Sequence, residues 1–292
     1  MRRLLVLVGV LVLCGCGGAQ SAMGPAPAFD RAIVVVLENK ARSQVLGNRA
    51  APAFSAFARQ GAVLSGYRGV THPSLPNYLA LVSGSTHGIA SDCTSCTVAG
   101  PSLADTLEAH GLTWKAYAEG LPQPGWTGPY RGSYAKKHVP FLYFRRVLAS
   151  PARLRRVVPL SQLGRDRAAG KLPTFSLVVP DLCHDMHSCS VETGDAWLKR
   201  FLPPLLKLPR TAVFVVFDES DSADPGIPAL ALGPLVRPGS RYGGAMSHYA
   251  LLRTIEDGLS LPRLGLSARA APVTGIWRGP PAPGKQGSAA GH

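Results

Sequence analysis

The sequence has 292 residues, of which 46% are hydrophobic and 16% charged, so the chain can bury a core and is neither a disordered tail nor a coiled coil. With 31 Lys and Arg against 17 Asp and Glu, the formal net charge of +14 excludes an acidic solvating protein and favours anionic partners. Charge alone does not choose between phosphate esters, lipid headgroups and nucleic acid.

The first residues have the pattern of an export signal. Two arginines precede an apolar run, Leu4 to Leu13, that is about half as long as a membrane-spanning helix requires. The run is followed by Cys14-Gly15-Cys16, which resembles a bacterial lipobox. We therefore expect a lipoprotein signal peptide over residues 1–15 and a lipid on Cys16. Ordinary cleavage, which would release a secreted or periplasmic protein, is the alternative.

Lipidation would anchor the protein to the membrane of the bacterial cell envelope, because lipoproteins of this kind carry several acyl chains. Residues 16–29 are rich in Gly, Ala and Pro and are predicted to form a flexible tether. A single domain is predicted over 30–278, and the Pro/Gly/Ser-rich residues 279–292 are predicted to form a disordered tail.

Strand and helix patterns alternate along the predicted domain. In chain order, the strands are expected at 32–37, 112–118, 175–179, 212–217 and 227–232, and the helices at 52–60, 75–82, 102–110, 194–206 and 247–259. The strands at 32–37, 175–179 and 212–217 are apolar on both faces, as in a parallel sheet that is covered by helices on both sides. The pattern predicts an α/β/α sandwich with a central, mostly parallel sheet.

Polar residues follow three of these strands directly. Glu38-Asn39 follows the first strand, the run 181–187 (DLCHDMH) follows the strand at 175–179, and Asp218-Glu219 follows the strand at 212–217. Sites in open α/β sheets form beyond the carboxyl ends of the strands. Each acid alone could be a helix cap or a surface charge, but several acids at one point stay ionised only with a cation among them. The repeated placement therefore predicts a divalent metal site.

Ser74 lies in the run THPSLPNY, which spans residues 71–78. It can be interpreted as a helix N-cap, with Pro76 in the first turn and no further function. A nucleophile needs the same place, because free amide groups and the helix dipole there would stabilise an alkoxide and the phosphoryl oxygens that it attacks. The two interpretations are compatible, and spacing alone does not separate them.

Four further cysteines are interpreted in the light of export, because paired thiols oxidise outside the cytoplasm. Cys93-x2-Cys96 and Cys183-x5-Cys189 could be drawn as a four-thiolate zinc site, but two local disulfides are favoured. Three pairings can be drawn, and the local one is preferred because each pair lies within one predicted loop. The second disulfide would rigidify the segment around Asp185.

Eight pieces of the chain, in their order and spacing, resemble a family of bacterial phosphoesterases. That family groups acid phosphatases with phosphatidylcholine-type phospholipases C, within the alkaline-phosphatase-like superfamily. The pieces are VVVLENK at 34–40, THPSLPNYLALVSGSTHGI at 71–89, LEAHGLTWKAYAEGLP at 107–122, YAKKHVPFLYF at 134–144, VPDLCHDMHSC at 179–189, GDAWL at 194–198, VVFDES at 215–220 and SHYALLRTIED at 247–257. The resemblance implies an alkaline-phosphatase-like fold and hydrolysis of phosphate esters.

The resemblance also implies a metal site and a nucleophile. Glu38 and Asn39 match the first metal-binding motif, and Asp218 and Glu219 match the second. Ser74 matches the nucleophile, which would form a phosphoserine intermediate. Glu38 stands where nucleotide pyrophosphatases have Asp, and residues 218–220 do not read Asp-His-Gly, so one harder cation fits better than two zinc ions. The expected cofactor is one divalent ion: Ca, Mg or Zn.

The other matched positions are polar residues expected to contact substrate. Asn77 matches a donor to a phosphoryl oxygen, and Asp185 is expected to bind substrate. His138, His187 and His248 fall in the remaining motifs, and one of them is expected to protonate the leaving oxygen.

The resulting hypothesis is a metal-dependent phosphomonoesterase of the acid phosphatase type. A phospholipase C or another phosphodiesterase that acts on phospholipid headgroups is the enzymatic alternative. A non-catalytic, anion-binding envelope lipoprotein is the alternative of another class. Nucleic acid is not an expected partner, because the basic stretch at 144–157 lacks interleaved aromatic residues, and a monomer is expected.

Overall fold

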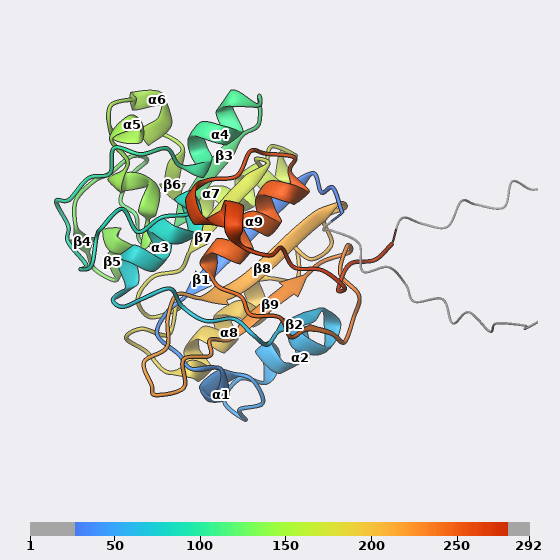
Figure 1. The fold of residues 1–292 in the computed structure, drawn as a ribbon. Helices are drawn as coiled ribbons and strands as arrows, with labels where there is room; N and C mark the ends of the chain where they lie inside the picture. Colours follow the sequence, from blue (N-terminus) through green and yellow to red (C-terminus); the bar gives the residue numbers. More distant parts are fainter. Residues whose placement is uncertain (1–26, 280–292) are drawn as a thin grey trace, which may run out of the picture.

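The computed structural model describes residues 27–279 (Figure 1). The predicted signal peptide, Cys16, most of the tether and all of the tail except its first residue lie outside the described residues, so the expectations about them stay predictions. Among the described helices, none combines the length and the hydropathy needed to cross a membrane.

A central sheet of eight strands has the order β10-β2-β9-β8-β1-β7-β3-β6. The strands are β1 (Arg31–Leu37), β2 (Ala62–Leu64), β3 (Trp114–Ala118), β6 (Val157–Pro159), β7 (Phe175–Val179), β8 (Thr211–Phe217), β9 (Ala229–Leu232) and β10 (Ser240–Tyr242). Only β9 among these eight runs antiparallel to its neighbours. The mostly parallel sheet that the alternating pattern predicts is therefore confirmed.

The centre of the sheet is β1, which pairs in parallel with β7 on one side and with β8 on the other. Val34 lies opposite Leu177 and Phe214, and all three side chains are fully buried. Burying a side chain of this size contributes about 2 kcal/mol. The continuous apolar runs form inner strands because both of their faces are covered.

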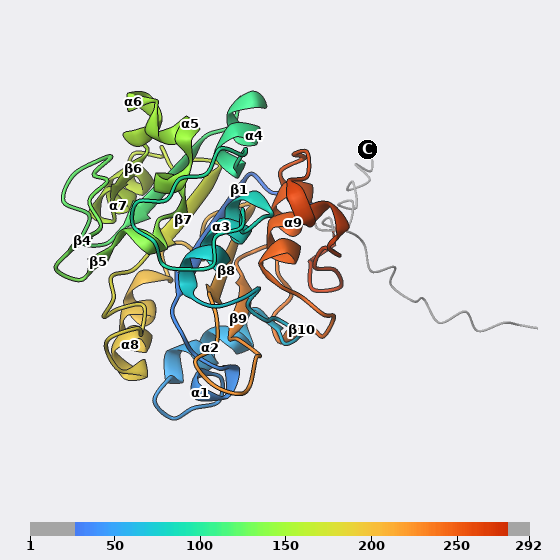
Figure 2. The same ribbon diagram turned by 60° about the vertical axis from the view of Figure 1, so that its left-hand side comes forward.

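Helices cover both faces of the sheet (Figures 1 and 2). They are α1 (Arg42–Val45), α2 (Pro52–Gln60), α3 (Ser74–Ser83), α4 (Leu103–Ala109), α5 (Arg145–Leu148), α6 (Pro151–Leu154), α7 (Ser161–Ala168), α8 (Val191–Phe201) and α9 (His248–Gly258). Helices α3 and α9 pack side by side on one face, and α2 packs against α8 on the other. The result is the predicted α/β/α sandwich.

Short elements complete the fold. They are a ribbon of β4 (Tyr130–Arg131) and β5 (Tyr134–Ala135), and the 3-10 turns η1 (Lys136–His138), η2 (Pro140–Tyr143) and η3 (Gly265–Arg269). Strand β5 of the ribbon is followed directly by η1, which returns the chain to the carboxyl edge of the sheet.

Several element boundaries differ from the predicted ones. Helix α8 begins three residues earlier than predicted, because the side chain of Ser190 accepts a hydrogen bond from the backbone N–H of Thr193 and caps the helix there. Ser74 is the first residue of α3 and Pro73 occupies the N-cap, so the interpretation of Ser74 as the cap is wrong. The strands β2, β6 and β10 were not predicted, because three residues show no periodicity.

Both local disulfides are present. Cys93 is bonded to Cys96 and Cys183 to Cys189, so the predicted pairing is confirmed and the thiols do not form a zinc site. The second disulfide closes the loop that contains Asp185.

Candidate active site

Acidic residues from three neighbouring strands meet at the carboxyl edge of the sheet. Glu38 and Asp218 are the first residues after β1 and β8, and Asp185 lies in the loop that follows β7. The backbone N–H of Asp218 donates to the Leu37 carbonyl at 3.0 Å, and that of Glu38 donates to the Asp185 carbonyl at 2.8 Å. The parallel register itself thus holds the three acidic residues together, as the strand-end pattern predicts.

Ser74 contacts this group from the first turn of α3. Its hydroxyl donates a hydrogen bond to Glu38 Oε2 at 2.9 Å, and the residue is 1% exposed. One turn later, the Tyr78 hydroxyl donates to Glu38 Oε1. Residues four apart lie on the same face of a helix, so α3 presents both hydroxyls to one carboxylate.

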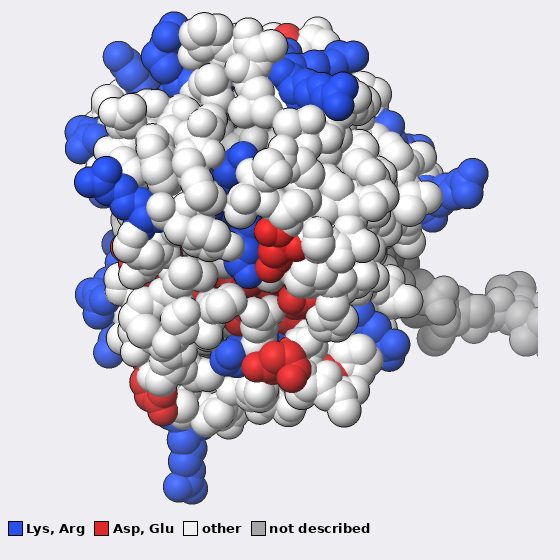
Figure 3. Space-filling model, turned by 90° about the vertical axis from the view of Figure 1, so that its left-hand side faces the viewer, with Lys and Arg blue, Asp and Glu red and all other residues white. Residues whose placement is uncertain are grey.

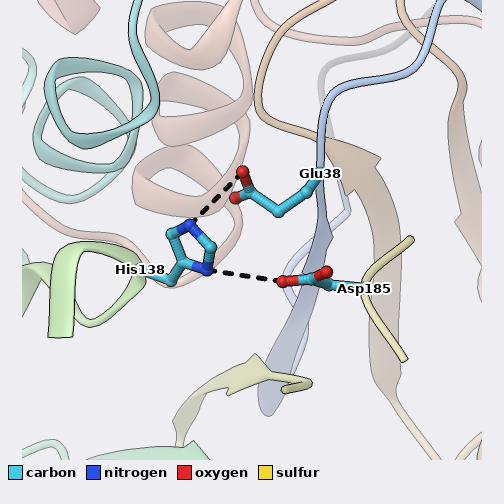
Figure 4. A group of neighbouring side chains, drawn as sticks. All are labelled: Glu38, His138 and Asp185. Carbon is cyan, nitrogen blue, oxygen red and sulfur yellow. Dashed lines mark ion pairs between the residues drawn. The ribbon is translucent and has the colours of Figure 1, made fainter. Parts of the chain in front are cut away.

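His138 lies between two carboxylates (Figure 4). Its Nε2 is 3.3 Å from Glu38 Oε2 and its Nδ1 is 3.4 Å from Asp185 Oδ2. The ring also stacks on Tyr78, with ring centres 5.2 Å apart. Burial, together with the charge of Lys137, lowers the pKa of His138 to about 3, so the imidazole is neutral and its ring nitrogen can be a metal ligand.

The donor set fits a cation. Glu38, His138 and Asp185 each offer a ligand atom, and these atoms lie within 4.8 Å of one another. Seven buried side-chain atoms have no hydrogen-bond partner among the described residues, and three of them belong to this site: His138 Nε2, Asp185 Oδ2 and Asp218 Oδ2. Buried polar atoms normally have hydrogen-bond partners, so three buried atoms without a partner at one point indicate a ligand site. His138, predicted as a candidate general acid, and Asp185, predicted to bind substrate, therefore belong to the candidate metal ligands.

The raised pKa values of the carboxylates at the site also indicate a site for a cation. Burial, reinforced by the charges of Asp218 and Asp185, raises the pKa of Glu38 well above its ordinary value. Burial raises the pKa of Asp185 to about 7, and burial together with Asp218 raises that of Glu219 to about 8. A bound positive ion would reverse these shifts because it stabilises the ionised carboxylates.

Asn39 and Glu219 lie at the edges of this group. The backbone N–H of Asn39 donates to Asp218 Oδ1 at 2.9 Å, with Asn39 in the left-handed region at φ 49°. Glu219 Oε2 is 2.5 Å from Nδ1 of the exposed His72. Asn39 thus orients Asp218 through its backbone, and the predicted metal-binding role of both side chains stays a prediction.

Asn77 is engaged with the loop that precedes α3. Its Oδ1 accepts from the backbone N–H groups of Val70 and Thr71 at 2.7 and 3.2 Å, and its Nδ2 donates to the Thr71 carbonyl at 2.7 Å. Nδ2 also lies 3.5 Å from Glu219 Oε2. The side chain therefore fixes the loop, and its predicted contact with a phosphoryl oxygen stays a prediction.

The two other predicted histidines differ in exposure. Both ring nitrogens of the buried His248 are occupied, since Nε2 lies 2.6 Å from the Asp218 carbonyl oxygen and Nδ1 lies 3.0 Å from the Tyr67 hydroxyl. His187 is exposed, and its ring centre is 6.1 Å from that of His138. His187 is therefore the most exposed of the three histidines, whereas His248 contacts the backbone of Asp218, and the predicted role of either as a general acid stays a prediction.

A second group of acidic and histidine residues stabilises the loop that contains Asp185. His184 Nδ1 lies 2.9 Å from Glu119 Oε2, and Asp181 Oδ1 accepts from the backbone N–H groups of Cys183 and His184 at 3.0 and 2.9 Å. These groups satisfy one another and tie the Asp185 loop to the end of β3.

Three residues of the site were missed by the sequence analysis: Tyr78, Asp92 and Lys137. Lys137 Nζ lies 2.7 Å from Asp92 Oδ2, and Asp92 Oδ1 accepts from the backbone N–H of Leu75 at 2.9 Å. Lys137 directly precedes His138, so the piece YAKKHVPFLYF contained a signal for it. Asp92 has no such signal, because it lies in a loop without periodicity.

The surface reflects this arrangement. Figure 3 shows acidic side chains within a hollow in the middle of one face, with lysine and arginine side chains nearby and around the edge of the molecule. The acidic side chains of this face thus gather in the hollow, whereas most of its basic side chains lie toward the edge of the molecule.

The chain is also similar to a known protein family and to known proteins. The model of the Phosphoesterase family matches residues 34–262. The chain belongs to the phosphoesterase family. A phosphatidylinositol-3-phosphatase of Mycobacterium tuberculosis is 37% identical over 94% of this chain and 94% of its own length. A probable acid phosphatase of Kluyveromyces lactis is 30% identical over 82% of this chain, which spans 60% of that protein.

Solved structures support the fold. A protein of the alkaline phosphatase superfamily from Vibrio parahaemolyticus aligns with a TM-score of 0.56 and 13% identity, over 81% of this chain and 69% of the other. The resemblance predicted from the sequence and the alkaline-phosphatase-like fold are confirmed. As a member of the phosphoesterase family, the protein is a phosphoric ester hydrolase.

Proposed function

We propose that this phosphoesterase is a metal-assisted phosphomonoesterase that forms a phosphoserine intermediate on Ser74. The observation that carries the proposal is the 2.9 Å hydrogen bond from the Ser74 hydroxyl to Glu38 Oε2, beside three buried nitrogen and oxygen atoms that have no hydrogen-bond partner among the described residues. A hydroxyl at the start of a ten-residue helix also lies at the positive end of the helix dipole, which favours the negative charge of a phosphoryl group.

Glu38, His138 and Asp185, with Asp218 alongside, would hold the cation. When bound, the ion would stabilise the ionised carboxylates, favour the alkoxide form of Ser74 and offset the charge of the phosphate. One imidazole among the oxygen donors suits Zn²⁺ better than the all-oxygen set expected from the sequence, while Mg²⁺ and Ca²⁺ remain candidates for the carboxylates.

The reaction would proceed in two displacements with balanced proton transfers. Ser74 Oγ attacks phosphorus while its proton passes to Glu38 Oε2, and the ester P–O bond breaks as His187 protonates the leaving oxygen. Water then attacks the phosphoserine and gives a proton to His187. The P–Oγ bond breaks, Ser74 recovers its proton from Glu38, and inorganic phosphate leaves.

The substrate would be an exposed phosphate monoester. The Mycobacterium tuberculosis relative is named for a phosphate monoester on a phospholipid, and it matches nearly the whole chain. We extend this substrate class to the present protein as part of the proposal. Export, and a lipid on Cys16 that holds the domain beside a membrane, belong to the same proposal.

Substitution of Ser74 by Ala tests the nucleophile. We expect Ser74→Ala to lower turnover of p-nitrophenyl phosphate by at least about 10⁴-fold, because the variant lacks the oxygen that attacks phosphorus. Ser83→Ala is the matched control, since Ser83 lies on the same helix, is also buried and donates to the Leu79 carbonyl at 2.7 Å. Retained turnover in a folded Ser74→Ala protein would exclude the mechanism.

A substrate panel tests the class of ester. We expect release of phosphate from an aryl monophosphate and from phosphatidylinositol 3-phosphate in vesicles, and little cleavage of bis-(p-nitrophenyl) phosphate or phosphatidylcholine. Faster cleavage of the last two would favour the phospholipase C alternative over a monoesterase.

A further inference from the structure

Asp92 and Lys137 form an ion pair at the edge of the site, with Nζ 2.7 Å from Oδ2 and side chains that are 26% and 10% exposed. The other oxygen of Asp92, Oδ1, accepts from the backbone N–H of Leu75 at 2.9 Å. Leu75 directly follows Ser74 in the first turn of α3, where backbone N–H groups have no acceptor within the helix. A single carboxylate therefore links the lysine to the turn that carries the hydroxyl.

Lys137 also faces the other groups of the site. Its charge lowers the pKa of Glu38, Asp185 and Glu219, each as a smaller effect than burial, which raises them. The lysine directly precedes His138 on η1. The ion pair thus connects three separate segments: the loop of Asp92, the start of α3 and the turn that carries His138.

The loop that carries Asp92 is held in place from both sides. The Cys93–Cys96 disulfide closes a small ring directly after Asp92, and Nζ of Lys136 donates to the Thr94 carbonyl inside that ring at 2.9 Å. Two successive lysines of η1 therefore attach to two positions of one cross-linked loop. This arrangement keeps the Asp92 carboxylate fixed relative to η1, as a positioning group requires.

We propose that Asp92 and Lys137 are positioning residues for Ser74. The pair locks the first turn of α3 against η1, so that the Ser74 hydroxyl stays on Glu38 Oε2. A charge-assisted bond from Leu75 to a carboxylate that is held by a lysine fixes this turn more firmly than a neutral cap would. The inference rests on the proposed role of Ser74 as the nucleophile.

Four variants test the pair: Asp92→Ala, Asp92→Asn, Lys137→Met and Lys137→Arg. Displacing a reacting group by about 1 Å costs about 100-fold in rate, so Asp92→Ala and Lys137→Met are expected to lower kcat for p-nitrophenyl phosphate by about 100-fold. KM is expected to change less than about threefold, since the substrate's own contacts remain. Lys137→Arg is expected to recover at least about a tenth of the wild-type kcat because it keeps the charge.

Asp92→Asn keeps an oxygen acceptor for the Leu75 N–H but loses the charge. It is expected to fold as the wild type does and to fall between the wild type and Asp92→Ala in kcat. It keeps the test decisive should Asp92→Ala fail to fold. The double variant Asp92→Asn/Lys137→Met is expected to lose no more kcat than Lys137→Met alone, because each change breaks the same link.

Lys115→Met is the matched structural control. Lys115 pairs with Asp166 at 2.5 Å, is partly buried, and lies on β3 without a contact to Ser74, Leu75 or Asp92. We expect it to lower thermal stability while kcat stays within about threefold of the wild type. A similar loss of kcat in Lys115→Met, or an unchanged kcat in folded Asp92→Asn and Lys137→Met, would overturn the proposal.

Trapping of the phosphoenzyme separates this proposal from the one on which it rests. Acid quenching during turnover of a ³²P-labelled monoester is expected to label the wild type, and to label Lys137→Met at a rate lower by about the same factor as kcat. An active Ser74→Ala protein would overturn the phosphoserine mechanism itself. An inactive Ser74→Ala protein beside a fully active Lys137→Met protein would overturn only the positioning role.

Discussion

Buried carboxylates in this protein are of two kinds, and hydrogen-bond partners distinguish them. Asp185 and Asp218 each leave one buried oxygen without a partner among the described residues. Glu256, on α9, is equally buried but accepts from the Leu264 N–H at 2.8 Å and from the Ser267 hydroxyl at 2.5 Å. The first kind indicates a ligand site, and the second holds the end of α9 against η3.

Glu256 predicts a pH-dependent term in stability. Burial raises its pKa from an ordinary 4.5 to about 7, so between these values the folded state binds more protons than the unfolded state. The free energy of unfolding must therefore fall as pH rises from about 5 to about 8, by up to roughly 3 kcal/mol for this group.

Urea denaturation of the wild type and of Glu256→Gln at pH 5 and pH 8 measures this term. Other titrating groups are common to both proteins and cancel in the comparison. The variant is expected to lose less stability between the two pH values, and an identical loss would contradict the assignment.

At the scale of elements, the site depends on how α3 is held at both of its ends. Its first turn is bound to the Asp92 loop, and its last residue is followed by Gly84 in the left-handed region at φ 70°. A Cβ at Gly84 would overlap the Leu264 carbonyl, because the end of α3 lies directly against η3. Only glycine allows this close approach.

Gly84→Ala is therefore expected to reduce the free energy of unfolding by about 3 kcal/mol or more, from the left-handed backbone and the steric overlap together. Gly88→Ala is the matched control, because Gly88 has φ 73° but no atom within 4 Å of the added methyl group. Its expected cost is about 1 kcal/mol. Equal costs in urea denaturation would show that close packing at the end of α3 is unimportant.

The elements also show what the sequence can and cannot predict. The strands β1, β7 and β8 were predictable because their apolar runs are buried on both faces, and Glu38 and Asp218 because they end such strands. Asp92 comes from a loop whose sequence carries no period, and Lys137 comes from a 3-10 turn where its place beside His138 is the signal. The role of His138 as a metal-ligand candidate required knowing that Asp185 lies beside it, which is a property of the tertiary fold.

At the scale of the whole molecule, the chain has a net charge of +14 but concentrates acids at one edge of the sheet. Glu38, Asp185, Asp218 and Glu219 meet there, and the charge of Lys137 only partly offsets the effect of burial on the pKa values of Glu38, Asp185 and Glu219. Without an added positive ion, their mutual repulsion and desolvation oppose folding.

Removal of metal is therefore expected to lower both activity and stability. A cation present at about 100 to 1,000 times its Kd stabilises the folded state by about 3–4 kcal/mol, which corresponds to a fall in Tm of about 6–16 °C on chelation. Differential scanning fluorimetry with EDTA and with added Zn²⁺, Mg²⁺ or Ca²⁺ measures this change in Tm. Glu38→Gln is expected to lose most of this response, and a Tm indifferent to chelator and metal would contradict a resident cation.

The central position of β1 has a consequence for how the molecule is made. Its two neighbours, β7 and β8, are synthesised more than 130 residues after it, so during synthesis this largely apolar strand has two open edges. Every incomplete chain that ends before β7 is therefore inactive and prone to aggregation through these strand edges. A chain that has not yet reached the end of β8 also lacks Asp218 and Glu219, so the acidic group of the site is completed only late in synthesis.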